Sequence, residues 1–123
     1  MKPGLLGLVL LSVGLSALSQ VALKAGMTSA PVQAAIATSS VTRIILTVFQ
    51  SWMVLAGLLS FGCSALVWLA VLSRVPLSTA YPFVALGIAI TTGAGLLLFN
   101  ESFSVLKFAG MLLIVSGVVA VAL

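Results

Sequence analysis

The stretch 52–72, WMVLAGLLSFGCSALVWLAVL, contains no charged side chain and decides the fold of this chain. About 20 such residues, wound as a helix, cross the roughly 30 Å hydrocarbon core of a bilayer. Runs of the same character occupy about 3–23, 77–99 and 103–123, and the charged residues lie between the runs or near their ends. Because backbone groups in lipid need internal partners, helices are expected. The sequence therefore predicts an all-α membrane protein with four transmembrane helices, folded as one domain over 1–123.

Composition excludes most other classes of protein. Of the 123 residues, 63% are hydrophobic and 5% are charged, whereas a soluble domain has about 25% charged residues. The five Lys and Arg residues are scattered, so no nucleic-acid partner is expected. With no His, one carboxylate and the single cysteine Cys63, the chain lacks a nucleophile–base pair and a metal-ligand set. We expect no enzyme activity, no metal and no cofactor.

The connections between the runs differ in length. Short links at 73–76 and 100–102 make the last three spans antiparallel neighbours. The first connection, 25–51, is long, and its segment 28–38 begins like a helix. We expect either a short helix at the membrane interface or an ordered, inert loop, with 41–49 leading into the second span. The first run is longer than the apolar core of a signal peptide, so we expect it to remain as a span.

A polar stripe runs along the first span. Ser12, Ser16, Ser19, Gln20 and Lys24 recur at helical spacing on broadly one face, which should line a cavity or another helix. A lysine at the end of a span can instead extend to the interface and have no further role. Gln20, one turn before Lys24, favours a pair of hydrogen-bond donors at the mouth of a cavity.

The remaining charges divide between the two sides of the membrane. Lys2 and Arg74 share one side, while Lys24, Arg43, Lys107 and the only acid, Glu101, share the other. This distribution sets no firm orientation. Glu101 has two candidate roles: an ion pair with Lys24, or a cap and dipole partner at the start of the fourth span after Asn100.

Two further patterns concern movement and assembly. Pro82 lacks a backbone N–H and Gly87 follows it, which predicts either a hinge or a static kink in the third span. Four helices form a wall and not an enclosed path, so we expect a dimer. Gly110 and Gly117 lie on one face of the fourth span, where small residues allow close helix packing, either between two chains or within one.

Several segments resemble the drug/metabolite transporter superfamily, in its small four-helix branch. They are SQVALK at 19–24, VPLSTAYP at 75–82, FNESFS at 99–104 and GMLLIVSGV at 110–118, and together they touch all four spans. The resemblance implies a small-multidrug-resistance-like fold and a multi-pass protein of the bacterial inner membrane.

Small multidrug resistance proteins, the more distant of two similar groups, exchange protons for organic cations through a glutamate in the first span. The matching position here is Ser16, and the tryptophan after their span-three tyrosine is Val84 here. This sequence keeps the tyrosine as Tyr81. A cation held in lipid needs a compensating negative charge, and no carboxylate lies within a predicted span. The resemblance to this group therefore does not imply proton-coupled cation export.

The chain is more similar to subunits of the aminoarabinose–phosphoundecaprenol flippase. The shared features are a Gln-x-x-x-Lys at Gln20 and Lys24, the turn around Tyr81 and Pro82, and the glutamate at Glu101. This resemblance implies translocation of a polyprenyl-phosphate-linked sugar by a homodimer or by a heterodimer with a paired small subunit. The longer first loop means that the sugar specificity does not transfer.

These observations lead to one main hypothesis, a flippase-type transporter subunit for an anionic lipid-linked substrate. Cations at the helix ends suit a phosphate head group. The expected substrate-binding residues are Lys24, Gln20, Ser16, Tyr81, Glu101, Arg43 and Arg74. Pro82 and Gly87 form the expected hinge, and Gly110 and Gly117 the dimer interface. The alternatives are a small exporter of cations and a non-transporting helper of a larger membrane protein.

Overall fold

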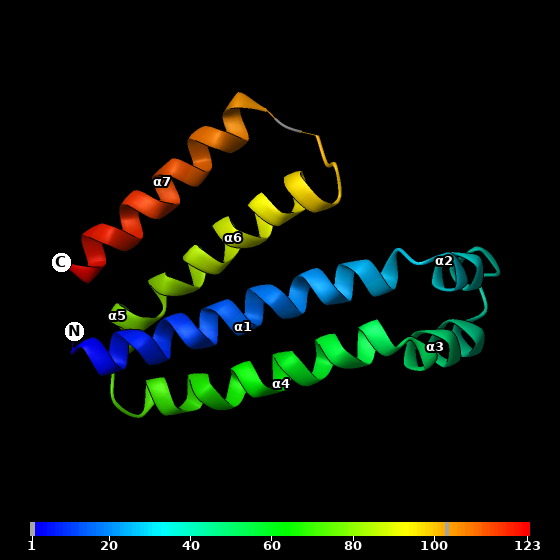
Figure 1. Cartoon of the computed structure of the whole chain (residues 1–123), viewed down its shortest axis with the longest axis horizontal. Helices are drawn as coiled ribbons and strands as arrows, with labels where there is room; N and C mark the ends of the chain where they lie inside the picture. Colours follow the sequence, from blue (N-terminus) through cyan, green and yellow to red (C-terminus); the bar gives the residue numbers. More distant parts are fainter. Residues whose placement is uncertain (1, 103) are drawn as a thin grey trace.

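The computed structural model describes residues 2–102 and 104–123, and within them the chain is helical with short links (Figure 1). The helices are α1 (Pro3–Met27), α2 (Ala30–Ala37), α3 (Val41–Gln50), α4 (Trp52–Leu72), α5 (Leu77–Ala80), α6 (Pro82–Leu98) and α7 (Val105–Ala122). Among the described residues, four segments are long and apolar enough to cross a membrane: α1, α4, the α5–α6 pair and α7. The predicted all-α class with four spans is confirmed.

Helix α1 is longer than the span predicted at 3–23. No helix-breaking residue interrupts it before the turn at Thr28, so the helix continues through Lys24 to Met27. Lys24 thus lies in the last turn, where a cation interacts favourably with the negative end of the helix dipole. The predicted polar stripe, from Ser12 to Lys24, therefore lies on one continuous helix.

Helices α1 and α4 lie side by side and antiparallel (Figure 1). Two buried glycines allow their close approach near the α2–α3 end. A Cβ added at Gly26 would lie 2.6 Å from Val54 Cγ2, and one added at Gly57 would lie 2.8 Å from Leu23 Cγ. Small residues permit such backbone contacts in lipid, where hydrophobicity does not drive helices together.

The third span is divided at the proline. Helix α5 ends at Ala80 and α6 begins at Pro82, with Tyr81 between them. Proline has no N–H to donate and its ring disfavours a continuous helix, so the break falls where the sequence predicted a hinge or kink. Ala80 and Phe83, on either side of the break, are buried against Val9 and Val13 of α1.

Helix α7 packs mainly on α6 and is otherwise exposed (Figure 1). It begins at Val105, because the Ser104 hydroxyl accepts a hydrogen bond from the Lys107 N–H at 3.1 Å and caps the helix. The alternative in which Glu101 caps this helix is therefore wrong. Phe103, the predicted first residue of the fourth span, lies outside the described residues.

The long connection forms two short helices beyond the ends of α1 and α4 (Figure 1). Ser39, with φ 58°, ends α2 in the left-handed region, and Ser40 accepts a hydrogen bond from the Arg43 N–H and starts α3. Helix α3 is thus separate from α4 and does not simply extend it.

Candidate functional site

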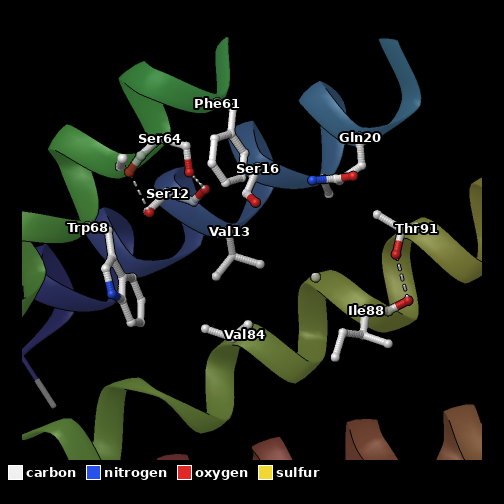
Figure 2. Close-up of a pocket in the computed structure, with 13 residues that line it drawn as sticks. Ser12, Val13, Ser16, Gln20, Phe61, Ser64, Trp68, Val84, Ile88 and Thr91 are labelled. Carbon is white, nitrogen blue, oxygen red and sulfur yellow. Dashed lines mark hydrogen bonds between the residues drawn. The ribbon is translucent and has the colours of Figure 1, made fainter. Parts of the chain in front are cut away.

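A groove with a volume of about 470 Å³ lies between α1, α4 and α6 (Figure 2). Phe61 and Ile88 are 45% and 54% exposed, so the groove is open along its side. Its walls are mostly apolar, with hydroxyls from all three helices and the side-chain amide of Gln20 from α1. The lining residues are Ser12, Val13, Ser16, Ala17, Gln20, Phe61, Ser64, Ala65, Trp68, Val84, Gly87, Ile88 and Thr91.

Each of the three helices contributes one face to this groove. Helix α4 supplies residues 61, 64, 65 and 68, and α6 supplies 84, 87, 88 and 91. This spacing of three, four and seven residues is one side of an α-helix. Gly87 brings α6 close to α1, because a Cβ there would lie 3.3 Å from Val13 Cγ1. The predicted hinge glycine is therefore also a close contact between the two walls.

Two serines join α1 and α4 at the deep end of the groove. The Ser12 hydroxyl donates to the Ser64 carbonyl at 3.0 Å, and the Ser64 hydroxyl donates to the Ser12 carbonyl at 2.8 Å (Figure 2). Both residues are buried, with exposures of 2% and 5%. Since both acceptors are backbone carbonyls, each bond survives removal of the other hydroxyl.

We expect the substitutions Ser12→Ala and Ser64→Ala to destabilise the chain independently. Each removes one bond, with a cost of about 0.5–1.5 kcal/mol, and the double variant should lose roughly the sum. Reversible unfolding in mixed micelles, followed by circular dichroism, measures these losses. Ser60→Ala, a partly buried serine one turn away on α4, is the matched control. A double variant no less stable than either single one would contradict this account.

The groove continues into a smaller hollow of about 200 Å³ at the Lys24 end. Gln20 and Thr91 line both hollows, so the two form one continuous surface. At this mouth, Lys24 Nζ lies 3.8 Å from Glu101 Oε2, and the two side chains are 51% and 46% exposed. An exposed ion pair of this kind contributes about 0–1 kcal/mol to stability. An anion that binds Lys24 more tightly can therefore displace the glutamate.

Gly95 provides the space that Glu101 occupies. A Cβ added at Gly95 would lie 3.1 Å from Glu101 Cδ and would overlap Oε1. The Gly95 carbonyl also accepts the N–H groups of Phe99 and Glu101, at 3.3 and 3.2 Å. With Asn100 in the left-handed region at φ 50°, the chain turns back at the end of α6. This turn places the carboxylate against α6 and toward Lys24.

The structure brings together four of the predicted substrate-binding residues and separates three. Ser16, Gln20, Lys24 and Glu101 line the connected hollows. Tyr81 is 61% exposed at the α5–α6 break and lines neither hollow. Arg43 lies on α3, and Arg74 lies in the turn between α4 and α5, at the other end of the bundle from Lys24 (Figure 1).

The predicted dimer glycines lie on open surface. A Cβ built at Gly110 or at Gly117 would meet no described atom within 4 Å. Among the described residues of α7, only Val118 is buried. This face of α7 is thus available to a second chain, and the alternative of packing within one chain finds no partner among the residues that the structure describes.

The sequence alone did not single out Phe61, Trp68 and Gly95 as site residues. Phe61 and Trp68 share the seven-residue spacing of a helix face, but every other face of α4 is equally apolar, which hides that signal. Gly95 lies two residues after Gly93, and nothing in the sequence around it marks it as a site residue. Its role depends on the return of the chain at Asn100, which only the folded structure displays.

The family profile described as Small Multidrug Resistance protein matches residues 27–114. The chain belongs to this family. With its four apolar spans it is a multi-pass membrane protein. No solved structure matches the chain.

Curated relatives of this family member include proteins named as probable flippase subunits. The probable 4-amino-4-deoxy-L-arabinose-phosphoundecaprenol flippase subunit ArnF of Pseudomonas fluorescens is 35% identical over 115 residues, which cover 91% of this chain and 82% of that protein. The ArnE subunit of the same organism is 42% identical over 67 residues, or 54% of this chain and 58% of ArnE. ArnE of Pseudomonas aeruginosa UCBPP-PA14 is 43% identical over 63 residues, 51% of this chain.

The chain thus spans little more than half the length of the ArnE relatives that it matches. Its predicted resemblance to the flippase subunits, and more broadly to small multidrug resistance proteins, is confirmed.

Proposed function

We propose that this chain is a subunit of a membrane transporter that moves an anionic polyprenyl-phosphate-linked sugar, or a related lipid carrier, across the bacterial inner membrane. The observation that carries the proposal is the gradient along the groove. Apolar walls from α1, α4 and α6 lead to a polar mouth that holds Gln20, Lys24, Thr91 and Glu101. A lipid with a phosphate head has the same gradient along its length.

The head group would bind at the mouth. Lys24 offers a flexible ammonium that can form a charge-assisted hydrogen bond with phosphate, and Gln20 lies one helical turn deeper. Ser16 follows on the same face, so polar groups lead from the mouth into the groove. Arg43, Arg74 and Tyr81 lie outside the hollows, and in this proposal they would meet a substrate only as it arrives or leaves.

The tail would remain in the bilayer. The side of the groove is open at Phe61 and Ile88, so a prenyl chain can stay in lipid while its head group lies against α1. A second chain would complete the path by packing on α7 at Gly110 and Gly117, either as a homodimer or as a paired small subunit. Light scattering that gives one chain per particle in mild detergent would exclude this arrangement.

A thermal-shift panel on the detergent-purified protein tests the proposal. Undecaprenyl phosphate and its sugar adducts should raise the unfolding temperature by several degrees, because a ligand at about 100 times its Kd stabilises the folded state by roughly 2.7 kcal/mol. Farnesol, which has a prenyl tail and no phosphate, is the control and should have a much smaller effect. Equal shifts for farnesol and the phosphates would contradict the proposal.

One observation supports a second candidate, a small exporter of organic cations. The Glu101 carboxylate lines the smaller hollow, so an acid is available at the mouth although none lies within a predicted span. In that case quaternary ammonium ions would stabilise the protein and protons would compete. If neither lipids nor cations shift the unfolding temperature and the chain copurifies with a larger membrane protein, the helper alternative is favoured.

A further inference from the structure

Helix α3 has two chemically different faces. Val41, Ile45 and Phe49 follow one another at four-residue spacing and are 69%, 50% and 57% exposed. Arg43 and Thr47 lie on the opposite side of the helix, where the Thr47 hydroxyl donates to the Arg43 carbonyl at 2.8 Å. An apolar stripe opposite a polar one is typical of a helix that lies at a boundary between water and hydrocarbon.

The neighbouring helix does not cover this apolar stripe. Helix α2 buries Val32 and Ala35, which are 1% and 3% exposed, and it packs mainly on α3, away from this stripe. Helix α3, which lies wholly within the described part of the chain, has no buried residue. Near 32–38 we expected either a short interfacial helix or an inert loop. A helix forms there, but the amphipathic character lies in the next helix, α3.

The connection to α4 sets the depth of α3 in the membrane. Ser51 alone separates the two helices, and its extended backbone, with φ −79° and ψ 117°, breaks the helical path. The next residue, Trp52, begins a membrane span and is 73% exposed. Tryptophan is enriched where acyl chains meet head groups. Because a single extended residue joins the helices, α3 must lie close to the depth of Trp52 in the membrane.

Charge favours a lipid surface with anionic head groups. The charged residues at this end of the bundle are Lys24, Arg43 and Lys107 with Glu101, a net charge of +2 from three cations less one acid. A basic side chain near a bilayer surface attracts anionic lipids. Arg43 is the charged residue of α3 itself, opposite its apolar stripe.

We infer that α3 is an interfacial anchor, which lies in the plane of the bilayer at the level of Trp52. Val41, Ile45 and Phe49 insert among the acyl chains, and Arg43 contacts phosphate head groups. The anchor holds the α2–α3 connection beyond the end of α1 (Figure 1), the helix whose last turn carries Lys24 of the groove mouth. It does not depend on which substrate the groove binds.

Paired cysteine variants of the full chain in vesicles test this inference. In a Cys63→Ser background, Ile45→Cys and Thr47→Cys are spin-labelled and reconstituted in phosphatidylcholine with phosphatidylglycerol. Collision with oxygen, which is concentrated in lipid, is compared with collision with a water-soluble nickel chelate. We expect the oxygen-to-nickel ratio to be several-fold higher at position 45 than at position 47. Each variant is used only if it unfolds at the same temperature as the Cys63→Ser parent.

Two results would overturn the inference. Equal ratios at positions 45 and 47 would mean that α3 does not lie along the boundary between water and hydrocarbon. A label at position 45 that is shielded from both reagents would mean that a second protein covers the stripe. If either variant fails to fold, Phe49→Cys and Gln50→Cys form a second pair with the same expectation. Arg43→Gln should reduce the dependence of the position-45 ratio on phosphatidylglycerol, and an unchanged dependence would remove the role of Arg43.

Discussion

Replacing Lys24 with alanine should weaken binding of undecaprenyl phosphate by at least ten-fold and abolish movement of its head group. A hydrogen bond to a charged group contributes about 1.5–3 kcal/mol, which corresponds to roughly a ten- to hundred-fold change in Kd. Loss of the half-exposed pair with Glu101 costs about 1 kcal/mol or less. The fold should therefore survive. Binding can be followed in a Trp52→Phe background as a change in the fluorescence of Trp68, which lines the groove.

Lys107→Ala is the matched control for Lys24→Ala. It removes a cation from the same side of the membrane, but Lys107 Nζ donates to the Ser102 carbonyl at 3.0 Å and lines neither hollow. Binding should be close to that of the unaltered chain. Equal losses from both substitutions would point to a general effect of charge, and unchanged binding by Lys24→Ala would remove the role of Lys24.

Glu101→Gln extends this experiment, because it separates the two candidate substrates. The substitution leaves Lys24 without its partner at 3.8 Å. If the groove binds anionic lipids, affinity for undecaprenyl phosphate should stay the same or rise. If it binds organic cations, their affinity should fall sharply, since the compensating charge is lost. A loss of lipid binding would show that Glu101 itself contacts the lipid head group.

The substitution Gly57→Val should cause a large loss of stability. The first added carbon would already lie 2.8 Å from Leu23 Cγ and 3.1 Å from the Leu23 backbone nitrogen. Helices α1 and α4 would have to separate near the groove mouth, and overpacking of this kind costs about 1–3 kcal/mol. Thermal unfolding in detergent measures the loss, which should appear as a clear fall in the unfolding temperature.

Gly62→Val provides the control on the same helix. A Cβ at Gly62 meets no described atom within 4 Å, so the same change in helix propensity occurs there without the overlap. The two variants should therefore differ in stability, with Gly62→Val close to the unaltered chain. If they unfold at the same temperature, the close approach of α1 and α4 at Gly57 is not a determinant of stability.

Much of the site could be anticipated from the polar residues of α1. Ser16, Gln20 and Lys24 were predicted to face a cavity because lipid rejects such a stripe, and all three line the connected hollows. Two roles were predicted for Glu101, an ion pair with Lys24 and a cap for the fourth span. In the structure Glu101 lies beside Lys24, and Ser104 caps the helix. The wall of the groove formed by α4 was not anticipated, since this helix is apolar on most of its surface.

The sequence by itself determined that this is a four-span membrane protein with its few charges at the span ends, because burying a charge in hydrocarbon is costly and runs of about 20 apolar residues have no other stable place. Tertiary structure alone decided which helix faces meet. In a span that is apolar on every side, the periodicity that marks a buried face is absent. The contacts are then set by the positions of small residues, such as Gly26 and Gly57, and by the return of the chain at Asn100.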